Sequence, residues 1–490
     1  MLGRLDQQRN FFDEILFGHM LPADHPLLDI DRAVDFSFVE EETADLYSAD
    51  QGRPSYPPEQ LVRILFLAVW ANLSDVQVCQ QLRYNVLYRY FCRIGWEDAI
   101  PDDTTLVRFR QRLGEERWQR LLQRLVEQAR AKGCLKGRWL VMDSSPVVAH
   151  AAARTRVQLL REGRQRLVQA VRQAAPPVAK ELEALAEPVP DTTYEDQDQL
   201  LQAEQEWTEA LLAAITSRQA AQAPAVRRVR KQVERVLKDE RVASYADPEA
   251  RWGHQRREKP FFGYKMHLAT DETGYVLAAT VTAGNASDLE GAPALVEQAR
   301  VQGLRPRRLV ADKAYDATRL REDLVRQGIR PYIPQRTQRQ RLPKQGFTYD
   351  KRRRQWIGPE GHRSIGQSPH QRGGWLVYFS ERACRGCPRA GRCLSRSQTR
   401  KVLYWHPGTE ANRPRGLKRA LRVRTVIERT FGEAKQWHGL GRSRYRGRER
   451  TAIQVLLTCL VLNAKKMARR LQDARGSGHG KRRAMEWAAA

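Results

Sequence analysis

The order of strand and helix signals between residues 138 and 333 constrains the fold of this chain more than any other feature. The signals follow one another as strand, hairpin, helix, strand, helix and strand. Such an order predicts a mixed sheet with helices on its faces, an α/β fold. The segments are the strand 138–142, the hairpin strands 262–270 and 275–282, the helix 289–302, the strand 307–311, the helix 316–326 and the strand 329–333.

Changes of composition divide the rest of the chain around this sheet. Ala, Gln, Glu, Arg and Leu dominate the stretch between the first strand and the hairpin, which indicates a helical insertion, and Arg, Gly and Pro dominate a second insertion. The expected parts are an N-terminal helical domain (1–132), a core built around the mixed sheet (133–154 and 245–334), the helical insertion (155–244), a small basic Cys-containing insertion (335–415), C-terminal core helices (416–472) and a disordered basic tail (473–490).

Charge is divided unevenly between the two parts of the chain. Residues 301–490 contain 46 Lys and Arg against 13 Asp and Glu, whereas residues 1–300 contain 39 against 44. Such an excess repels itself unless a polyanion binds it, and nucleic acid is the usual partner. A solvated basic surface is the alternative.

The N-terminal helix signals over 61–70 and 75–82 fit a DNA-binding helix-turn-helix. The alternative is a helical bundle that only packs against the rest of the protein.

Neither a membrane segment nor a signal peptide is expected. The longest apolar runs, 64–73 and 455–464, are too short to cross a bilayer, and residues 1–10 are polar. We therefore expect a cytoplasmic, nucleoid-associated protein with no membrane partner.

Three carboxylates are candidate metal ligands. Asp143 and Asp312 each follow the last apolar residue of an expected strand, so they would emerge at one edge of a parallel pair. Glu428 lies on a late helix. Hydrolysis of a phosphodiester needs an activated water and a clamp on the phosphate, which two carboxylate-bound divalent ions supply. Each residue also has a structural interpretation: such an aspartate can cap a helix, as expected for Asp316, and Glu428 can pair with Arg424.

Four groups of residues, in a fixed order, resemble the DDE transposases of bacterial insertion sequences. The most specific is the last, because the family signature is Tyr-x2-Arg-x3-Glu-x6-Lys and Arg424, Glu428 and Lys435 match its spacing. Leu421 stands at the tyrosine position, so no role of that hydroxyl carries over. The four groups are 52–54 and 72–75 with 101–105 and 109–110; 262–265 and 267 with 284–285 and 288; 311–316; and 424–435.

The resemblance implies an RNase H-like catalytic domain and a specific chemistry. Asp143, Asp312 and Glu428 would bind two Mg²⁺ or Mn²⁺ ions, and Arg424 and Lys435 would contact DNA near the cleaved end. The implied partners are double-stranded DNA, as transposon ends and as target, and a second copy of the chain in the active complex.

Alternating arginines follow the Glu428 helix. Arg442, Arg444 and Arg446, continued by Arg448 and Arg450, would track a phosphate backbone if the segment is extended. A solvated surface strand is the other interpretation. His267, within the second group of matching residues, would either approach the metal site or be a buried histidine bonded to backbone.

The cysteines leave a second metal site open. Cys384, Cys387 and Cys393 form a C-x2-C-x5-C pattern that suits zinc if a histidine completes the set; His362, His370 and His406 are candidates. A reduced cluster without metal is the alternative. The other four cysteines are scattered, which is typical of buried thiols in a reducing compartment.

Three further functions compete with transposition. An RNase H-like nuclease would cleave DNA without joining it, and strand-transfer assays separate the two. A catalytically dead DNA-binding copy would not need all three carboxylates. An RNA-binding protein with a basic tail would need neither the two strand-end aspartates nor the spaced Arg-Glu-Lys helix.

Overall fold

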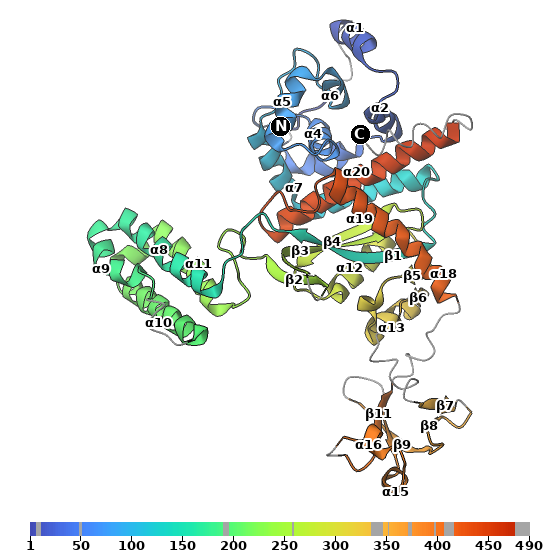
Figure 1. Cartoon of the computed structure of the whole chain (residues 1–490). Coiled ribbons are helices and arrows are strands. Elements are labelled where there is room, and N and C mark those ends of the chain that lie inside the picture. Colours follow the sequence, from blue (N-terminus) through green and yellow to red (C-terminus); the bar gives the residue numbers. More distant parts are fainter. Residues whose placement is uncertain are drawn as a thin grey trace.

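The computed structural model describes residues 1–5, 11–48, 51–189, 196–256, 259–334, 346–350, 352–370, 375–395, 398–405 and 416–475. A six-stranded mixed sheet lies at its centre, in the order β2-β3-β1-β5-β6 with β4 also paired to β3 (Figure 1). The predicted mixed sheet is confirmed. Its strands are β1 (Trp139–Val148), β2 (Arg251–Arg256), β3 (Lys259–Thr270), β4 (Val276–Ala283), β5 (Arg308–Val310) and β6 (Arg330–Tyr332).

β1 is longer than the sequence suggested. The prediction that this strand ends at Asp143 is wrong, because antiparallel pairing with β3 continues as far as Val148 opposite Gly263. On its other edge β1 pairs in parallel with β5 only up to Val141. The unpaired edge beyond that point tolerates Pro146, which has no N–H to donate to a ladder.

Helices cover both faces of the sheet. α20 (Arg448–Arg475) and α19 (Thr425–Trp437) lie on one face, and α12 (Asp288–Val301) on the other, where Gly291 packs against the His267 ring (Figure 1). α13 (Thr318–Arg326) joins β5 to β6. The expected layering of helices on a sheet is therefore present.

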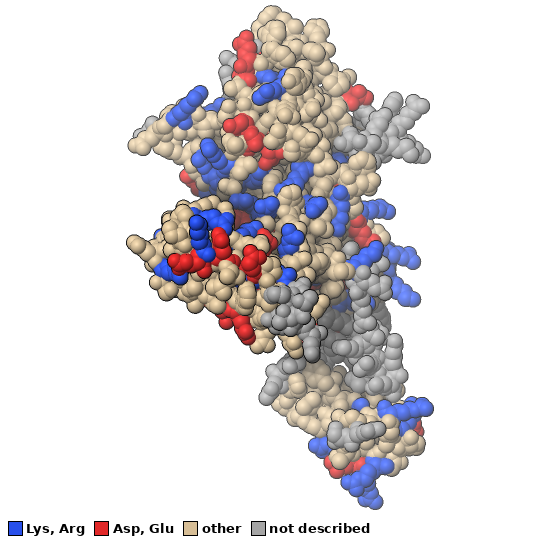
Figure 2. All heavy atoms as spheres, turned by 60° about the vertical axis from the view of Figure 1, so that its left-hand side comes forward, with Lys and Arg blue, Asp and Glu red and all other residues tan. Residues whose placement is uncertain are grey.

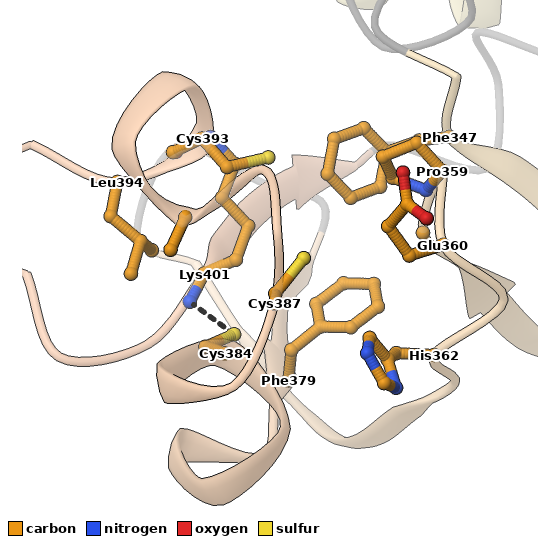
Figure 3. A pocket seen from close by; sticks show the side chains of 12 residues that line it. Phe347, Pro359, Glu360, His362, Phe379, Cys384, Cys387, Cys393, Leu394 and Lys401 are labelled. Carbon is orange, nitrogen blue, oxygen red and sulfur yellow. Dashed lines mark hydrogen bonds between the residues drawn. The ribbon is translucent and has the colours of Figure 1, made fainter.

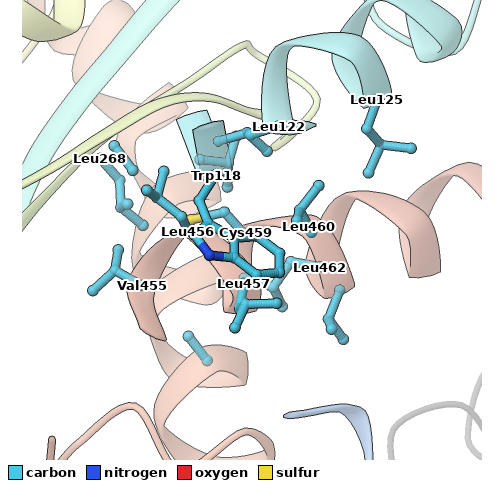
Figure 4. Packing of buried hydrophobic residues seen from close by; sticks show 14 of the residues in the cluster. Trp118, Leu122, Leu125, Leu268, Val455, Leu456, Leu457, Cys459, Leu460 and Leu462 are labelled. Carbon is cyan, nitrogen blue, oxygen red and sulfur yellow. The ribbon is translucent and has the colours of Figure 1, made fainter. Parts of the chain in front are cut away.

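α20 is the central helix of the hydrophobic core. It is long and apolar enough to cross a membrane by composition, but 94% of its most apolar stretch is buried inside the protein. Figure 4 shows Leu456, Cys459 and Leu460 packed beside Trp118 from α7 (Asp103–Ala131). Packing against the protein's own helices therefore accounts for the apolar character of α20.

The N-terminal helices share this core. The helices α4 (Pro58–Trp70) and α5 (Asp75–Tyr84) meet at 104° across a short turn, which is typical of a helix-turn-helix. Ser74 and Gln77 form a capping box that starts α5. The helices before α7 are α1 (Phe11–Met20), α2 (Pro26–Ala33), α3 (Phe38–Thr43), α4 (Pro58–Trp70), α5 (Asp75–Tyr84) and α6 (Val86–Phe91).

The helical insertion has a hydrophobic core of its own and projects from the sheet between β1 and β2 (Figure 1). Inside it, buried Glu204 accepts from Arg161 at 2.6 Å and pairs with Arg164 at 2.5 Å. The predicted helical insertion is present. Its helices are α8 (Arg156–Ala174), α9 (Pro176–Ala186), α10 (Gln197–Thr216) and α11 (Pro224–Lys238).

The Cys-containing insertion is a small β structure. A three-stranded sheet and a hairpin enclose a core that includes Phe347, Trp356 and Phe379. The three-stranded sheet includes the two most apolar segments of the insertion, 375–379 and 402–405. Its elements are β7 (Thr348–Asp350), β8 (Gln355–Ile357), β9 (Ser364–Pro369), β10 (Trp375–Phe379), β11 (Val402–Trp405), α15 (Glu381–Arg385) and α16 (Ala390–Cys393); α18 (Leu417–Leu421) follows. Most of the predicted tail, 476–490, lies outside the described residues.

Candidate active site

Strand register brings the two aspartates to one level of the sheet. Val141 of β1 pairs with Val310 of β5, and Asp143 and Asp312 each stand two residues further along. Because side chains alternate along a strand, both carboxylates face the side covered by α19. The Asp312 carboxylate also accepts the Ala314 N–H at 2.7 Å, which holds the turn after β5 in place.

Arg424 links the aspartates to the glutamate. Its Nη2 donates to Asp143 Oδ2 at 2.7 Å and lies 3.8 Å from Glu428 Oε1. Burial raises the pKa of Asp143, the Arg424 guanidinium opposes that rise, and Asp312 adds to it. Burial alone would lower the pKa of Arg424, but Asp143, Asp312 and Glu428 together raise it. Three carboxylates from three segments thus act on one guanidinium.

Glu428 is the most open member of the three. Its side chain is 59% exposed, compared with 16% for Asp143. It lies in the first turn of α19, and Lys435 lies in the last turn. The spacing 424, 428 and 435 places all three side chains along one helix face. Lys435 is half-buried, and burial lowers its pKa.

The donor set fits a hard divalent cation. Within the described residues, no three His, Cys, Asp or Glu side chains are grouped closely enough to hold one ion. Arg424 nevertheless lies 2.7 Å from Asp143 and 3.8 Å from Glu428, and the charge of Asp312 also acts on it. Oxygen ligands of this kind are those that Mg²⁺ prefers. The site therefore supplies the oxygen ligand type that the sequence predicted.

Asp316 does not cap the following helix, as the sequence predicted. Ala317 is the N-cap of α13. The Asp316 carboxylate instead accepts from Arg321 Nε at 2.9 Å, and both side chains are buried. One residue, Ala317, separates Asp316 from Thr318, the first residue of α13.

His267 lies away from the carboxylates. It stands opposite Ser144 on β1, so its side chain points to the face opposite that of Asp143. Its Nε2 lies 2.8 Å from Thr282 Oγ1, and burial lowers its pKa to about 4. Of the two alternatives, approach to the metal site is therefore wrong. The expectation of a buried histidine is confirmed, although its partner is a hydroxyl rather than backbone.

The arginine segment is only partly available to DNA. Arg442 and Arg446 are exposed, and Arg442 lies beside the end of β1, where Val148 donates to Gly441 O at 3.0 Å. Arg444 instead donates to Leu73 O at 2.5 Å and to Asn72 Oδ1 at 2.6 Å. Arg448 and Arg450 belong to the first turn of α20 and do not continue an extended strand.

A neighbouring cluster, which the sequence did not reveal, joins this segment to the N-terminal helices. Asp75 accepts two hydrogen bonds from Arg110, at 3.1 and 2.7 Å, and the Arg110 guanidinium lies 4.3 Å from the Tyr445 ring centroid. Asn72, Asp75 and Arg110 all belong to the first matching group. These three residues therefore hold the segment after α19 through its Arg444 and Tyr445 side chains. A single sequence does not reveal that these two distant segments are in contact.

The second matching group also has a structural explanation. Gly263 lies so close to β1 that a Cβ would meet Val147 O at 2.2 Å. Lys265 pairs with Asp288 at 3.0 Å, which ties β3 to the start of α12. In the third matching group, burial raises the pKa of Tyr315, and Asp288, Asp143 and Asp312 raise it further. These residues support the sheet beneath the carboxylates.

The three cysteines of the basic insertion line one small pocket (Figure 3). Cys384, Cys387 and Cys393 share it with His362 and with the apolar rings of Phe347 and Phe379. Cys384 Sγ accepts the Lys401 N–H at 3.4 Å.

The other two histidine candidates are placed differently. The His370 ring packs against Tyr404, with centroids 5.0 Å apart. His406 lies outside the described residues. His362 is therefore the candidate that the structure places beside the cysteines.

Comparison with known families identifies the chain. A family model described as a transposase DDE domain matches residues 239–464, and one described as a transposase domain (DUF772) matches residues 16–112. The chain therefore belongs to the DDE transposases, metal-dependent enzymes that cut DNA and transfer the cut strand. More specifically, the two domains together make it an insertion-sequence transposase. Asp312 and Glu428 lie inside the matched segments and Asp143 lies outside both.

Proposed function

We propose that this transposase binds the terminal inverted repeats of its element, cleaves the DNA at their ends and joins the freed 3′ hydroxyl to target DNA. The observation that carries the proposal is the convergence of Asp143, Asp312 and Glu428, from β1, the turn after β5 and α19, on one guanidinium. Because both steps are in-line displacements at phosphorus, one site can serve both.

The three carboxylates would hold two Mg²⁺ ions, or Mn²⁺, as a metal-binding triad. The bound ions would polarise the scissile phosphate and lower the pKa of the attacking water. Asp143 is largely shielded from water, burial raises its pKa, and the neighbouring Arg424 guanidinium opposes that rise. Glu428, on the exposed side, leaves the site open to a duplex.

Arg424 and Lys435 would bind phosphate groups next to the cleaved bond. The two side chains flank Glu428 on one face of α19, and seven residues of helix separate Lys435 from Glu428 by about 10 Å. A half-buried ammonium such as Lys435 attracts an anion more strongly than a fully solvated one. The assignment of the chain to the Tyr-Arg-Glu-Lys group stays part of this proposal.

DNA binding would extend well beyond the active site. The helix-turn-helix geometry of α4 and α5 suits recognition of the repeat, with α5 in the major groove. Exposed Arg442 and Arg446 would contact the backbone, and Arg444 would brace their segment. Figure 2 shows Lys and Arg gathered above and to the right of the helical insertion, whose own surface mixes both charges.

Two copies of the chain would act together, because a transposition complex holds two DNA ends. We therefore propose a homodimer in the active complex, working in the cytoplasm on nucleoid DNA. Size-exclusion chromatography with light scattering, with and without end duplexes, tests the assembly. A 2:2 complex is expected, and a 1:1 complex in cleavage-competent samples would contradict it.

The cysteine pocket would bind a structural zinc ion. Three thiols and the His362 imidazole line one pocket of the small β insertion, and such a set suits tetrahedral zinc. Metal analysis of purified protein should give one zinc per chain, which Cys387→Ser should lose while Cys459→Ser, a buried core thiol, should not. Equal zinc contents in all three proteins would contradict the assignment.

Strand transfer is the reaction that separates a transposase from a nuclease. Pre-cut end duplexes with a free 3′ hydroxyl, mixed with plasmid and Mg²⁺, should give joined products with the wild-type protein. Asp143→Asn should abolish joining yet bind the ends with nearly wild-type affinity. Cleavage of uncut ends without any joining of pre-cut ends would favour the nuclease. Binding without either reaction would favour a DNA-binding relic.

A further inference from the structure

Four arginines line a cavity at the starts of β1 and β5. Arg138, Arg305, Arg307 and Arg308 are all exposed and surround a volume of about 490 Å³. Within the described part of the chain, none of the four forms an ion pair with a carboxylate. Four unneutralised guanidinium groups around one cavity repel one another unless an anion lies between them.

Hydrogen bonds and close packing hold the backbone of the segments that carry these arginines. Arg307 N–H donates to Arg138 O at 2.9 Å, and Arg330 N–H donates to Arg307 O at 3.0 Å. Gly137 has a φ of +60°, and a Cβ there would lie 3.0 Å from Leu304 Cδ2. The two loops that carry the arginines therefore pack closely, so the cavity is a built feature of the sheet.

The carboxylates near the cavity accept hydrogen bonds from backbone N–H groups, so they do not neutralise the arginines. Asp271 Oδ2 accepts the Lys136 N–H at 2.9 Å, and Glu272 Oε2 accepts the Trp139 N–H at 3.1 Å. Arg308 lies over the Trp139 ring at 4.8 Å, which holds its guanidinium at the cavity wall. The positive charge is thus left available to an external anion.

Arg308, at one wall of the cavity, lies in line with Asp312 of the candidate active site. Arg308 and Asp312 share β5 and its continuation and are four residues apart, so they are separated by about 13 Å on the same face. The exposed basic residues Lys418, Arg419 and Arg422 lie on the segment that leads to Arg424. One strand of a duplex advances about 3.4 Å per base pair, so this spacing spans about four base pairs.

We propose that the arginine cavity, defined by Arg138, Arg305, Arg307 and Arg308, binds a backbone phosphate of double-stranded DNA about four base pairs from the scissile phosphate. It is a second anchoring point, at the opposite end of the parallel strands from the carboxylates. The identity of the scissile phosphate rests on the proposed function. The anchored duplex is either the DNA flanking the transposon end or the target, which offer the same phosphate chemistry.

The test compares a triple variant, Arg138→Gln/Arg305→Gln/Arg307→Gln, with a charge-matched control in the helical insertion, Arg172→Gln/Arg227→Gln/Arg241→Gln. Affinity for end duplexes is measured in EDTA over a range of salt. The cavity variant should bind about tenfold more weakly and lose about one unit of salt slope per phosphate released, and the control should stay within about twofold of wild type. Wild-type affinity and slope in the cavity variant would overturn the proposal.

A methylphosphonate scan then locates the contact, because that substitution removes one phosphate charge at a time. Replacement of the phosphate about four base pairs from the cleavage point should weaken binding by the wild-type protein and leave binding by the cavity variant unchanged. That result supports the site. A loss in flank-containing end duplexes assigns it to flanking DNA, and a loss confined to target duplexes in strand transfer assigns it to target. An identical scan for both proteins would overturn it. Because binding is measured without metal, failure of cleavage would refute the proposed function and leave this result standing.

Discussion

The Asp75–Arg110 pair provides a quantitative test of how the N-terminal helices hold the catalytic half. The Arg110 side chain is 5% exposed and that of Asp75 is 16% exposed. Removal of one partner from a buried ion pair costs about 3–5 kcal/mol, because the other charge is left without compensation. Arg110 keeps the Tyr445 ring as a weaker partner, so we expect Asp75→Leu to cost about 3 kcal/mol.

The double variant tests whether the loss of stability comes from the uncompensated charge. Replacement of both charges by apolar groups removes the uncompensated charge, so Asp75→Leu/Arg110→Met should recover all but about 1 kcal/mol, the share lost with an acid at the start of α5. Hydrogen exchange with mass spectrometry gives the opening free energy of α5 and of residues 439–446, and α10 serves as the internal control. A loss below 1 kcal/mol in Asp75→Leu, or additive losses in the double variant, would refute the account.

Three further predictions concern the core. Trp118→Ala should destabilise the core by about 3–5 kcal/mol in urea unfolding, because the indole is fully buried against α20, and a loss below 1 kcal/mol would contradict that packing. Gly291→Ala should cost about 1–3 kcal/mol, because its Cβ would meet the His267 ring at 2.6 Å, and an unchanged midpoint would refute the contact. Burial lowers the pKa of His267 and of His438 to about 4, so the unfolded chain binds more protons between pH 6.5 and 4. Stability should therefore be full above pH 6.5 and fall by up to about 3 kcal/mol per histidine toward pH 4, and a flat profile in urea titrations would contradict it.

The sheet could be predicted from local patterns because each strand and helix carries its own periodicity. The level of Asp143 and Asp312 also followed, because the two expected strands, 138–142 and 307–311, have equal lengths and their first parts pair in parallel. The end of β1 could not be predicted, because its continuation depends on β3, more than a hundred residues away. Asp316 was misassigned for a similar reason: its partner, Arg321, is fixed by the packing of α13 onto β6.

The candidate site was predictable in its residue types and less so in its contacts. The Arg-Glu-Lys spacing placed Arg424 beside Glu428, but its closer bond to Asp143 spans a chain separation that no local pattern encodes. Arg444 resembled its neighbours in sequence and differs from them only because the α4–α5 turn lies against it. The arginine cavity had a weak signal, the three arginines within 305–308, but its fourth member, Arg138, precedes β1 in a distant part of the sequence.

The most direct test of the central claim is metal-dependent cleavage of a labelled duplex. The duplex has the sequence of one end of the element, taken from the DNA that flanks this reading frame. Wild-type protein should nick the end with Mg²⁺ and not in EDTA. Asp312→Asn should lose nicking while it still binds, and Asp323→Asn, an exposed acid on the neighbouring helix α13, should retain it. Full activity of Asp312→Asn, or nicking in EDTA, would contradict the assignment of these carboxylates as the metal-binding triad.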